Sequence, residues 1–152
     1  MTVLPLLVAI QSCSLFGSID SPSEGENIKF TIECWSETKG TLTEESTMEN
    51  FGLYGFLFAS PWDTHNVPDF ISNEEVTKAS GWATNYRYPK DGRYLRFYAY
   101  SPYNCTGATL PGTETSGAIL IRYTVPSDIT QQSDLMVSVS EDILGQDAPG
   151  SI

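Results

Sequence analysis

The sequence predicts an all-β fold, a β-sandwich of about seven short strands, and three observations support this prediction. Apolar and polar residues alternate in several short segments, as in Ile28–Cys34, which is the pattern of a strand with one buried face. Residues that favour turns separate these segments at intervals typical of sandwiches. No amphipathic pattern is long enough for an ordinary helix. The 152 residues suffice for one domain with a single core.

The composition is that of an acidic, folded protein. Eight Lys and Arg residues against nineteen Asp and Glu residues give a formal net charge of −11. This charge repels the phosphate backbone of nucleic acids, which argues against nucleic-acid binding. The content of 40% hydrophobic and 12% aromatic residues is high enough for burial to offset the entropy of the chain, which argues against a disordered protein.

Six further segments are predicted as elements of the sheets. Phe51–Phe58 is apolar on both faces, which predicts a central strand deep in the core. Gly81–Pro89 and Tyr94–Tyr100 flank the tight turn Lys90–Arg93, and this arrangement predicts a hairpin. The remaining segments are Phe70–Lys78, which forms a short strand or a turn, Ile119–Val125 and Leu135–Val139.

Alternation within three of these segments predicts which side chains share a face. In Tyr94–Tyr100, one face carries Leu95, Phe97 and Ala99, and the tyrosines lie on the other. In the two later segments we expect the apolar set to face the core. These sets are Ile119, Ile121, Tyr123 and Val125 in the first, and Leu135, Val137 and Val139 in the second.

The start of the chain has the features of an export signal. Val3–Ile10 is an apolar run of signal-peptide length and is too short to span a bilayer. It ends close to Cys13, and the small residue Ser12 before this cysteine is similar to a lipobox. Cleavage before Cys13 and acylation of its thiol would anchor the protein to a membrane. The alternative is that Val3–Ile10 forms a buried strand and that Cys13 is a packed thiol.

A tether is predicted between this anchor and the fold, because residues 14–27 are rich in Ser, Gly, Pro, Asp and Glu. The expected organisation is therefore a signal peptide over residues 1–12, a lipid-anchored tether over 13–27 and a β-sandwich domain over 28–152.

Two cysteines remain if Cys13 carries lipid. Cys34 and Cys105 are then an even pair in a compartment that permits disulfides, and they form the candidate disulfide of the chain. Their spacing does not show whether they meet. No Cys-x-x-Cys or His-Cys cluster is present, so the sequence indicates neither a zinc site nor any cofactor.

Catalytic motifs are missing from the sequence. His65 is the only histidine, and its surroundings are those of a surface loop. No nucleophile elbow, metalloprotease motif or phosphate-binding glycine loop occurs. Paired carboxylates such as Glu74 and Glu75 are better explained as solvated charge than as a hydrolytic pair. We therefore expect a protein that is not an enzyme.

The tyrosines of the predicted hairpin have two interpretations. Tyr94, Tyr98 and Tyr100 are a candidate binding surface, because tyrosine offers rigid amphipathic contact area to glycans or proteins. The alternative is packing against Tyr86 and Tyr88 in the other arm of the hairpin.

Several of these features occur in a recognisable order. The export start ending in Cys13 is followed by Phe-Gly-Leu-Tyr-Gly-Phe at 51–56 and by Leu-Arg-Phe-Tyr-Ala-Tyr-Ser-Pro at 95–102. Tyr-Thr-Val-Pro at 123–126 and Asp-Leu-Met-Val at 134–137 complete the series. In this order the sequence resembles the fimbrillin family over roughly residues 28–143.

The resemblance implies a Greek-key-like, transthyretin-like β-sandwich, the N-terminal domain of a type V pilus subunit. It also implies export as a lipoprotein to the outer membrane, followed by assembly on the cell surface in a fimbrium. Family members usually continue into a second sandwich, so we expect a fragment or a reduced member that lacks this domain.

Assembly in this family implies donor-strand insertion by other pilin subunits. Proteolysis would release the first strand, here Ile28–Cys34, and a neighbour's strand would replace it. The processing loop would be Ser36–Asn50, in which Lys39–Gly40 stands where the family typically carries an arginine. The alternative function is a lipid-anchored surface module that binds a glycan or a host protein and does not polymerise.

Overall fold

The structure of the chain, a computed structural model, describes residues 13–14, 27–34, 48–59, 62, 67–110 and 122–145. Within these ranges the regular elements are short strands and two 3₁₀ turns. The 3₁₀ turns are η2 (Lys78–Ser80) and η3 (Ile129–Gln131). The strands are β1 (Cys13–Ser14), β2 (Asn27–Lys29), β3 (Glu33–Cys34), β4 (Asn50–Phe58), β5 (Ile71–Thr77), β6 (Ala83–Arg87), β7 (Tyr94–Ser101), β8 (Ala108–Thr109), β9 (Arg122–Tyr123), β10 (Met136–Val139) and β11 (Ile143–Leu144).

The larger layer is an antiparallel sheet in the order β10-β7-β4-β5, with β11 as a second partner of β7. Strand β4 lies in the middle of this sheet, between β7 and β5. Most of its residues are fully buried. The prediction of a central strand covered on both faces is therefore confirmed.

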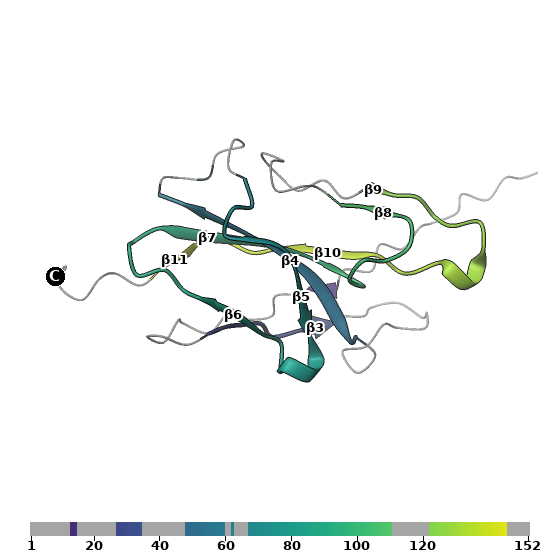
Figure 1. Cartoon of the computed structure of the whole chain (residues 1–152), viewed down its shortest axis with the longest axis horizontal. Coiled ribbons are helices and arrows are strands. Elements are labelled where there is room, and N and C mark those ends of the chain that lie inside the picture. The colour runs from purple at the N-terminus through teal and green to yellow at the C-terminus, as the bar shows by residue number, and fades with distance from the viewer. Residues whose placement is uncertain are drawn as a thin grey trace, which may run out of the picture.

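The smaller layer is built on residues 27–34, which we call the first segment. Its beginning, β2, pairs with β6, and its end, β3, pairs with β1. Figure 1 shows β6 and the neighbouring first segment below the layer that contains β7, β4 and β10, with β8 and β9 paired above at one end. These layers form an all-β fold of antiparallel sheets, consistent with the predicted sandwich.

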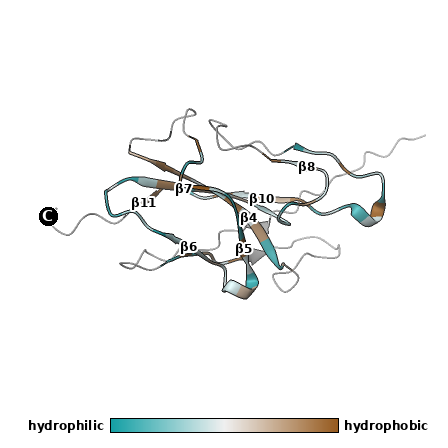
Figure 2. Ribbon diagram, in the orientation of Figure 1, coloured by the Kyte–Doolittle hydropathy of each residue, from teal (hydrophilic) through white to brown (hydrophobic). Residues whose placement is uncertain are grey.

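The main core lies between the two layers. The first segment contributes Ile28, Phe30 and Ile32, and the five-stranded sheet contributes alternate residues of β4 and β7. The ribbon of β4 is accordingly hydrophobic along much of its length in Figure 2. The core residues on β4 and β7 are Phe51, Leu53, Leu95, Phe97 and Ala99.

A second apolar cluster covers the opposite face of the same sheet. Its fully enclosed members come from the other parity of β4 and β7, namely Tyr54, Phe56, Phe58 and Tyr100. Half-buried aromatic and leucine side chains, among them Trp62, Tyr98 and Leu135, pack against them. We call this surface the aromatic face. Because both faces of β4 are covered, the sheet is the centre of the domain.

The predicted hairpin is wrong. Strand β6 pairs with β2, and β7 pairs with β4, β10 and β11, so the two arms belong to different layers. The turn between them therefore crosses from one layer to the other. Trp82 and Thr84 are buried and Tyr86 is half-buried, so these side chains face the core. Both predicted segments contain strands, but these strands do not pair with each other.

The predicted orientation of the last strand is also wrong. Val137 and Val139 are 60% and 54% exposed, whereas Met136 packs against the main core. The register explains this result, since Val137 lies opposite Tyr100 and Ser138 lies opposite Ala99. Paired residues of neighbouring strands point to the same face, so the valines lie on the side of the aromatic face.

Two other predictions differ from the structure. Val125 is predicted to face the core, but it is 62% exposed. Cys13–Ser14 form β1, although residues 13–27 are predicted as a tether. The apolar run Val3–Ile10 and most of the tether lie outside the described residues, so the division into signal peptide, tether and domain stays a prediction.

Gly52 is required by the packing of β7 on β4. It lies opposite Tyr100, and a Cβ atom at this position would overlap the Tyr100 ring, which is fully buried. We expect Gly52→Ala to lower the free energy of unfolding by about 1–3 kcal/mol, because the ring has no free space to enter. Urea denaturation followed by Trp fluorescence measures the change.

Gly55→Ala is the matched control on the same strand. Its Cβ would approach the Ile71 side chain at 3.1 Å, a contact that a small side-chain shift relieves. We therefore expect a smaller loss of stability than for Gly52→Ala. An equal or larger loss of stability for Gly55→Ala would contradict the inference that the Tyr100 ring requires glycine at position 52.

Candidate functional site

The first segment, residues 27–34, enters the core through alternate side chains. Ile28, Phe30 and Ile32 are at most 4% exposed, whereas Lys29 and Thr31 face solvent. The Phe30 ring meets the rings of Phe51 and Phe97 edge to face, with centroids 5.7 and 5.4 Å apart. Such pairs add to the free energy gained by burial. The predicted alternation of this strand is confirmed.

Backbone bonds hold the segment along one edge. The Phe30 N–H donates to the Trp82 carbonyl over 3.1 Å, and the Thr84 hydroxyl donates to the Ile28 carbonyl over 3.2 Å. The ladder with β6 is short, and its register shifts between Asn27 and Lys29. The segment is therefore attached more by its buried side chains than by a long hydrogen-bonded ladder. Removing it would expose an apolar groove together with unpaired backbone groups of β6.

The candidate processing site lies outside the described residues. Lys39 and Gly40 belong to the stretch between Cys34 and the buried Met48, and the structure describes none of that stretch. Cleavage at this position stays a prediction.

The cysteines have partly defined positions. Cys13 and Cys34 are backbone partners in the β1–β3 ladder. Cys105 is a free, buried cysteine, and burial raises the pKa of its thiol, which makes the reactive thiolate less populated. The pairing of Cys34 with Cys105 and the lipidation of Cys13 stay predictions.

The candidate tyrosine surface is mostly a packing surface. Tyr100 is fully buried, and Tyr94 and Tyr98 are half-buried on the aromatic face. The Tyr94 ring stacks on Phe58 with centroids 5.8 Å apart, and Tyr98 meets Phe56 at 5.5 Å. Tyr86 and Tyr88 pack against the main core instead, so they are not partners of these tyrosines. Only Tyr94 and Tyr98 retain surface that a ligand can touch.

Tyr100 also organises the end of the sheet. Its hydroxyl donates to the Asn73 side-chain oxygen over 2.6 Å and accepts from the Asn104 N–H at 3.4 Å. Both asparagines have positive φ angles, 51° and 49°, a conformation that asparagine tolerates better than most residues. The buried hydroxyl is thus satisfied by two residues with positive φ, one in β5 and one in the turn after β7.

A polar group that the sequence did not reveal lies on the aromatic face. The guanidinium of Arg96 stacks over the Trp62 ring at 4.2 Å from its centroid, and its Nε donates to the Asp142 carboxylate over 2.7 Å. The parity of Arg96 places it on the same face as Tyr94 and Tyr98. No signal in the sequence brings Trp62 or Asp142 to it, since both come from distant turns.

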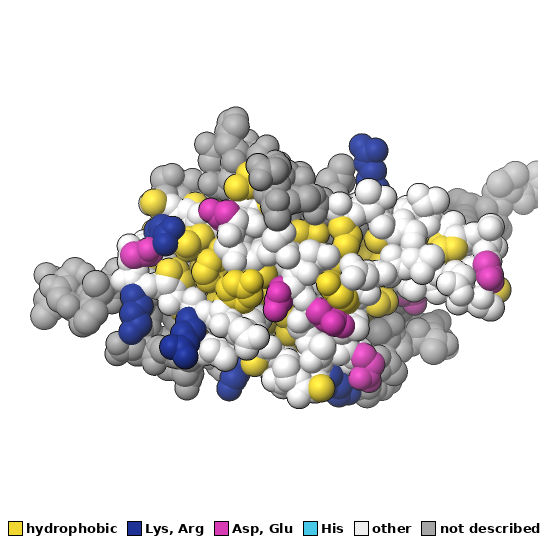
Figure 3. All heavy atoms as spheres, in the orientation of Figure 1, with side chains coloured by type: hydrophobic (Ala, Val, Ile, Leu, Met, Phe, Trp, Pro, Cys, Tyr) yellow, Lys and Arg dark blue, Asp and Glu magenta, His cyan; other side chains and the backbone are white. Residues whose placement is uncertain are grey.

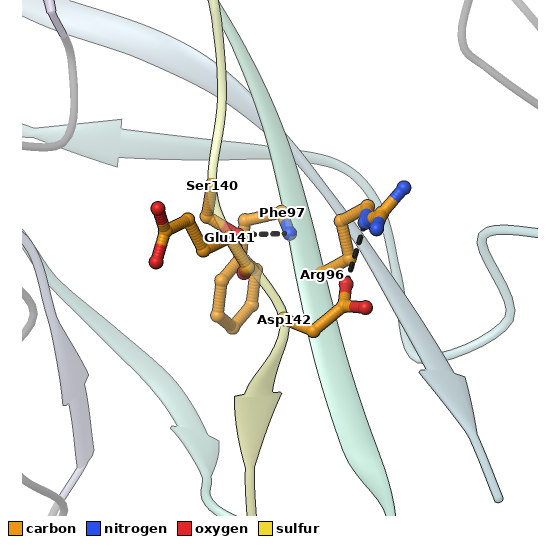
Figure 4. Close-up of polar contacts among 5 residues, drawn as sticks. All are labelled: Arg96, Phe97, Ser140, Glu141 and Asp142. Atoms are coloured by element: carbon orange, nitrogen blue, oxygen red, sulfur yellow. Dashed lines mark hydrogen bonds and ion pairs between the residues drawn. The ribbon is translucent and has the colours of Figure 1, made fainter. Parts of the chain in front are cut away.

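The turn that carries Asp142 is a bulge between β10 and β11. Val139 lies opposite Tyr98 and Ile143 opposite Leu95, so one more residue is present on this strand than on β7. The Phe97 N–H donates to the Ser140 hydroxyl over 2.9 Å in place of a backbone carbonyl. Figure 4 shows this bond beside the Arg96–Asp142 pair. The bulge places Asp142 beside Arg96, and the two contacts hold the segment between β10 and β11 against β7.

The described residues contain neither a candidate metal site nor a candidate membrane span. No group of three or more His, Cys, Asp and Glu side chains that could hold a metal ion occurs in this part of the chain. No helix within the described ranges is long and apolar enough to cross a membrane. His65 lies outside those ranges.

The chain is 28% identical over 148 residues to the fimbrium subunit Fim1C of Phocaeicola vulgatus. The chain resembles a fimbrial subunit. The match covers 82% of the chain but 39% of the relative, so the chain spans about two fifths of that protein. This similarity confirms the predicted resemblance to pilins of the fimbrillin type.

No family model matches the chain, and no solved structure matches it.

The buried tyrosines predict a loss of stability at alkaline pH. Burial, and then the charges that Tyr100 and Tyr103 would carry, raise the pKa of Tyr54 to about 12. The unfolded chain releases this proton near pH 10, whereas the folded protein retains it. Stability is therefore complete below about pH 10 and falls between about pH 10 and 12, by at most about 1.4 kcal/mol per pH unit for this group.

The measurement is the free energy of unfolding in urea at a series of pH values from 9 upward. Tyr54→Phe keeps the ring and removes the ionisable group, so we expect a shallower decline with pH than in the original protein. Tyrosinate absorbance recorded on the folded protein provides a second readout. Equal alkaline slopes for both proteins would show that Tyr54 does not titrate as the burial of its ring implies.

Proposed function

We propose that the chain is a structural subunit of a bacterial surface fimbrium, assembled by strand exchange at the position of the first segment, residues 27–34. The similarity to a named fimbrium subunit supports the role in a fimbrium. The observation that supports strand exchange is that one short segment fills the core with Ile28, Phe30 and Ile32 while pairing over only a few residues. We infer a structural rather than a catalytic role.

The physical basis is the completion of a sheet edge. An incoming strand with apolar residues at alternate positions would regain the burial of three core side chains together with the backbone bonds to β6. Burying one large apolar side chain is worth about 1.5–3 kcal/mol. The free energy of the protein therefore changes little when one strand replaces an equivalent one. Assembly would be driven by the higher free energy of a subunit whose groove is empty.

Two further parts of the proposal come from the sequence. Cleavage after Lys39 would release the first segment, because Lys39–Gly40 stands at the position of the processing site that the resemblance implies. Lipid on Cys13 would hold the exported protein at the outer membrane until that cleavage. The partners would be other pilin subunits that donate a strand.

Strand exchange is tested with a cut protein and labelled peptides. A specific protease site replaces the residues around Lys39–Gly40 in the full chain, and a fluorescent peptide copies residues 27–34 with Ser in place of Cys34. We expect the peptide to enter the cut protein and not the uncut one, because only cleavage frees the groove. Fluorescence anisotropy and size-exclusion chromatography measure peptide capture and self-assembly.

Two altered peptides provide the matched control. Ser in place of Ile28, Phe30 and Ile32 removes the buried face and should abolish capture, whereas Ser in place of Lys29 and Thr31 should leave it nearly unchanged. Equal capture of the two peptides would reject the proposed groove. A cut protein that keeps its own strand, captures no peptide and stays monomeric would reject assembly by strand exchange.

A further inference from the structure

A cavity opens at one end of the five-stranded sheet, beyond the last residue of β7. It has a volume of about 350 Å³. Strand β7 ends at Ser101 because Pro102 has no N–H to donate to the ladder. The register places Asn50 on one side of the line along which β7 would continue, and the residues just before Met136 on the other side.

Hydrogen bonds direct the chain away from this line. The Ser101 hydroxyl donates to the Asn50 carbonyl over 2.8 Å, and the Tyr103 N–H donates to the Asn50 side-chain oxygen over 3.1 Å. The chain after Pro102 is therefore tied to β4 instead of continuing between β4 and β10. The space that a longer β7 would fill remains as the cavity.

Both methionines and carboxylates line the cavity. Met48 is 3% exposed and Met136 is half-buried, so the methionines supply enclosed apolar surface beside the buried Ser101. Glu49 and Asp134 are exposed and supply two carboxylates. None of the described residues that line the cavity is basic. In Figure 3, acidic side chains lie beside hydrophobic ones in the middle of the face shown.

We propose that this cavity binds a lysine or arginine side chain presented by an extended segment of a partner polypeptide. The methylene stem of such a side chain packs well on flexible methionines, while its charged head pairs with the carboxylates. The extended conformation follows from the position of the cavity, because a segment placed there continues the line of β7 between residues 48–50 and 133–136. The net charge of −11 adds long-range attraction for a basic partner.

This interaction does not depend on strand exchange. The first segment, residues 27–34, belongs to the smaller layer, where it pairs with β6 and β1. The cavity belongs to the five-stranded sheet, at the end of β7. An uncut protein that captures no donor strand can still bind a basic segment in the cavity, so the two proposals fail separately.

The probe is a blocked synthetic pentapeptide, Thr-Val-Lys-Val-Thr, and its control has Gln in place of Lys. The chain contains only three methionines, Met1, Met48 and Met136, so methyl labelling gives a simple NMR spectrum. We expect saturable shifts of the Met48 and Met136 signals with the Lys peptide and none of the Met1 signal. The Gln peptide should bind at least about tenfold more weakly than the Lys peptide. Added salt should lower the affinity of the protein for the Lys peptide.

Charge-matched double variants identify the carboxylates. Glu49→Gln with Asp134→Asn should reduce the affinity for the Lys peptide by about tenfold or more, a loss of at least about 1.4 kcal/mol. Glu141→Gln with Asp69→Asn changes the net charge equally outside the cavity and should have little effect. All four side chains are on exposed residues, so we expect both proteins to fold.

Three results would overturn the proposal. The first is the absence of saturable Met48 and Met136 shifts at millimolar Lys peptide. The second is equal binding of the Lys and Gln peptides, which would leave no role for the cation. The third is an equal loss of affinity in the two double variants, which would show that binding depends on the net charge of the protein and not on Glu49 and Asp134. The first two results need only the unmodified protein, so they do not depend on the folding of any variant.

Discussion

The pairing of β4 with β7 is the interaction on which the other elements depend. The two strands run antiparallel over nearly their whole length, and each buries side chains on both faces of the sheet. One face receives Phe30 of the first segment, and the other carries Tyr54 and Tyr100. The close approach of the Tyr100 ring to Gly52 shows how tightly the pair is packed. A change that separated these strands would open both cores at once.

This arrangement makes the two layers unequal, and the inequality bears on assembly. The five-stranded sheet has long ladders of its own, whereas the smaller layer consists of short pairings around residues 27–34. That segment is held mainly by the burial of its side chains against the five-stranded sheet, and it contributes no strand to that sheet. In the proposed strand exchange, the β4–β7 pair would retain its hydrogen bonds throughout.

The two edge strands of the larger sheet discourage pairing with another chain in different ways. Edge strand β5 carries Glu74 and Glu75 and an Asn73 with positive φ, all of which discourage pairing with another chain. Edge strand β10 carries no charge and exposes Val137 and Val139. The bulge at Ser140–Asp142 and the Arg96–Asp142 pair end the regular pairing of this edge. Protection against unwanted pairing thus comes from charges at one edge and from a bulge at the other.

The sequence by itself determined the positions of several strands and of their central member. Period-two alternation located Ile28, Phe30 and Ile32 on a buried face, and the doubly apolar run Phe51–Phe58 identified β4, because burial leaves a direct record in residue type. Only the tertiary structure decided which strands pair. The tight turn at Lys90–Arg93 suits a hairpin and a crossover between layers equally, and the register with β7, not the hydrophobicity of β10, directed the valines outward. The Arg96 group and the cavity after Ser101 join residues from distant turns, and local sequence carries no record of such contacts.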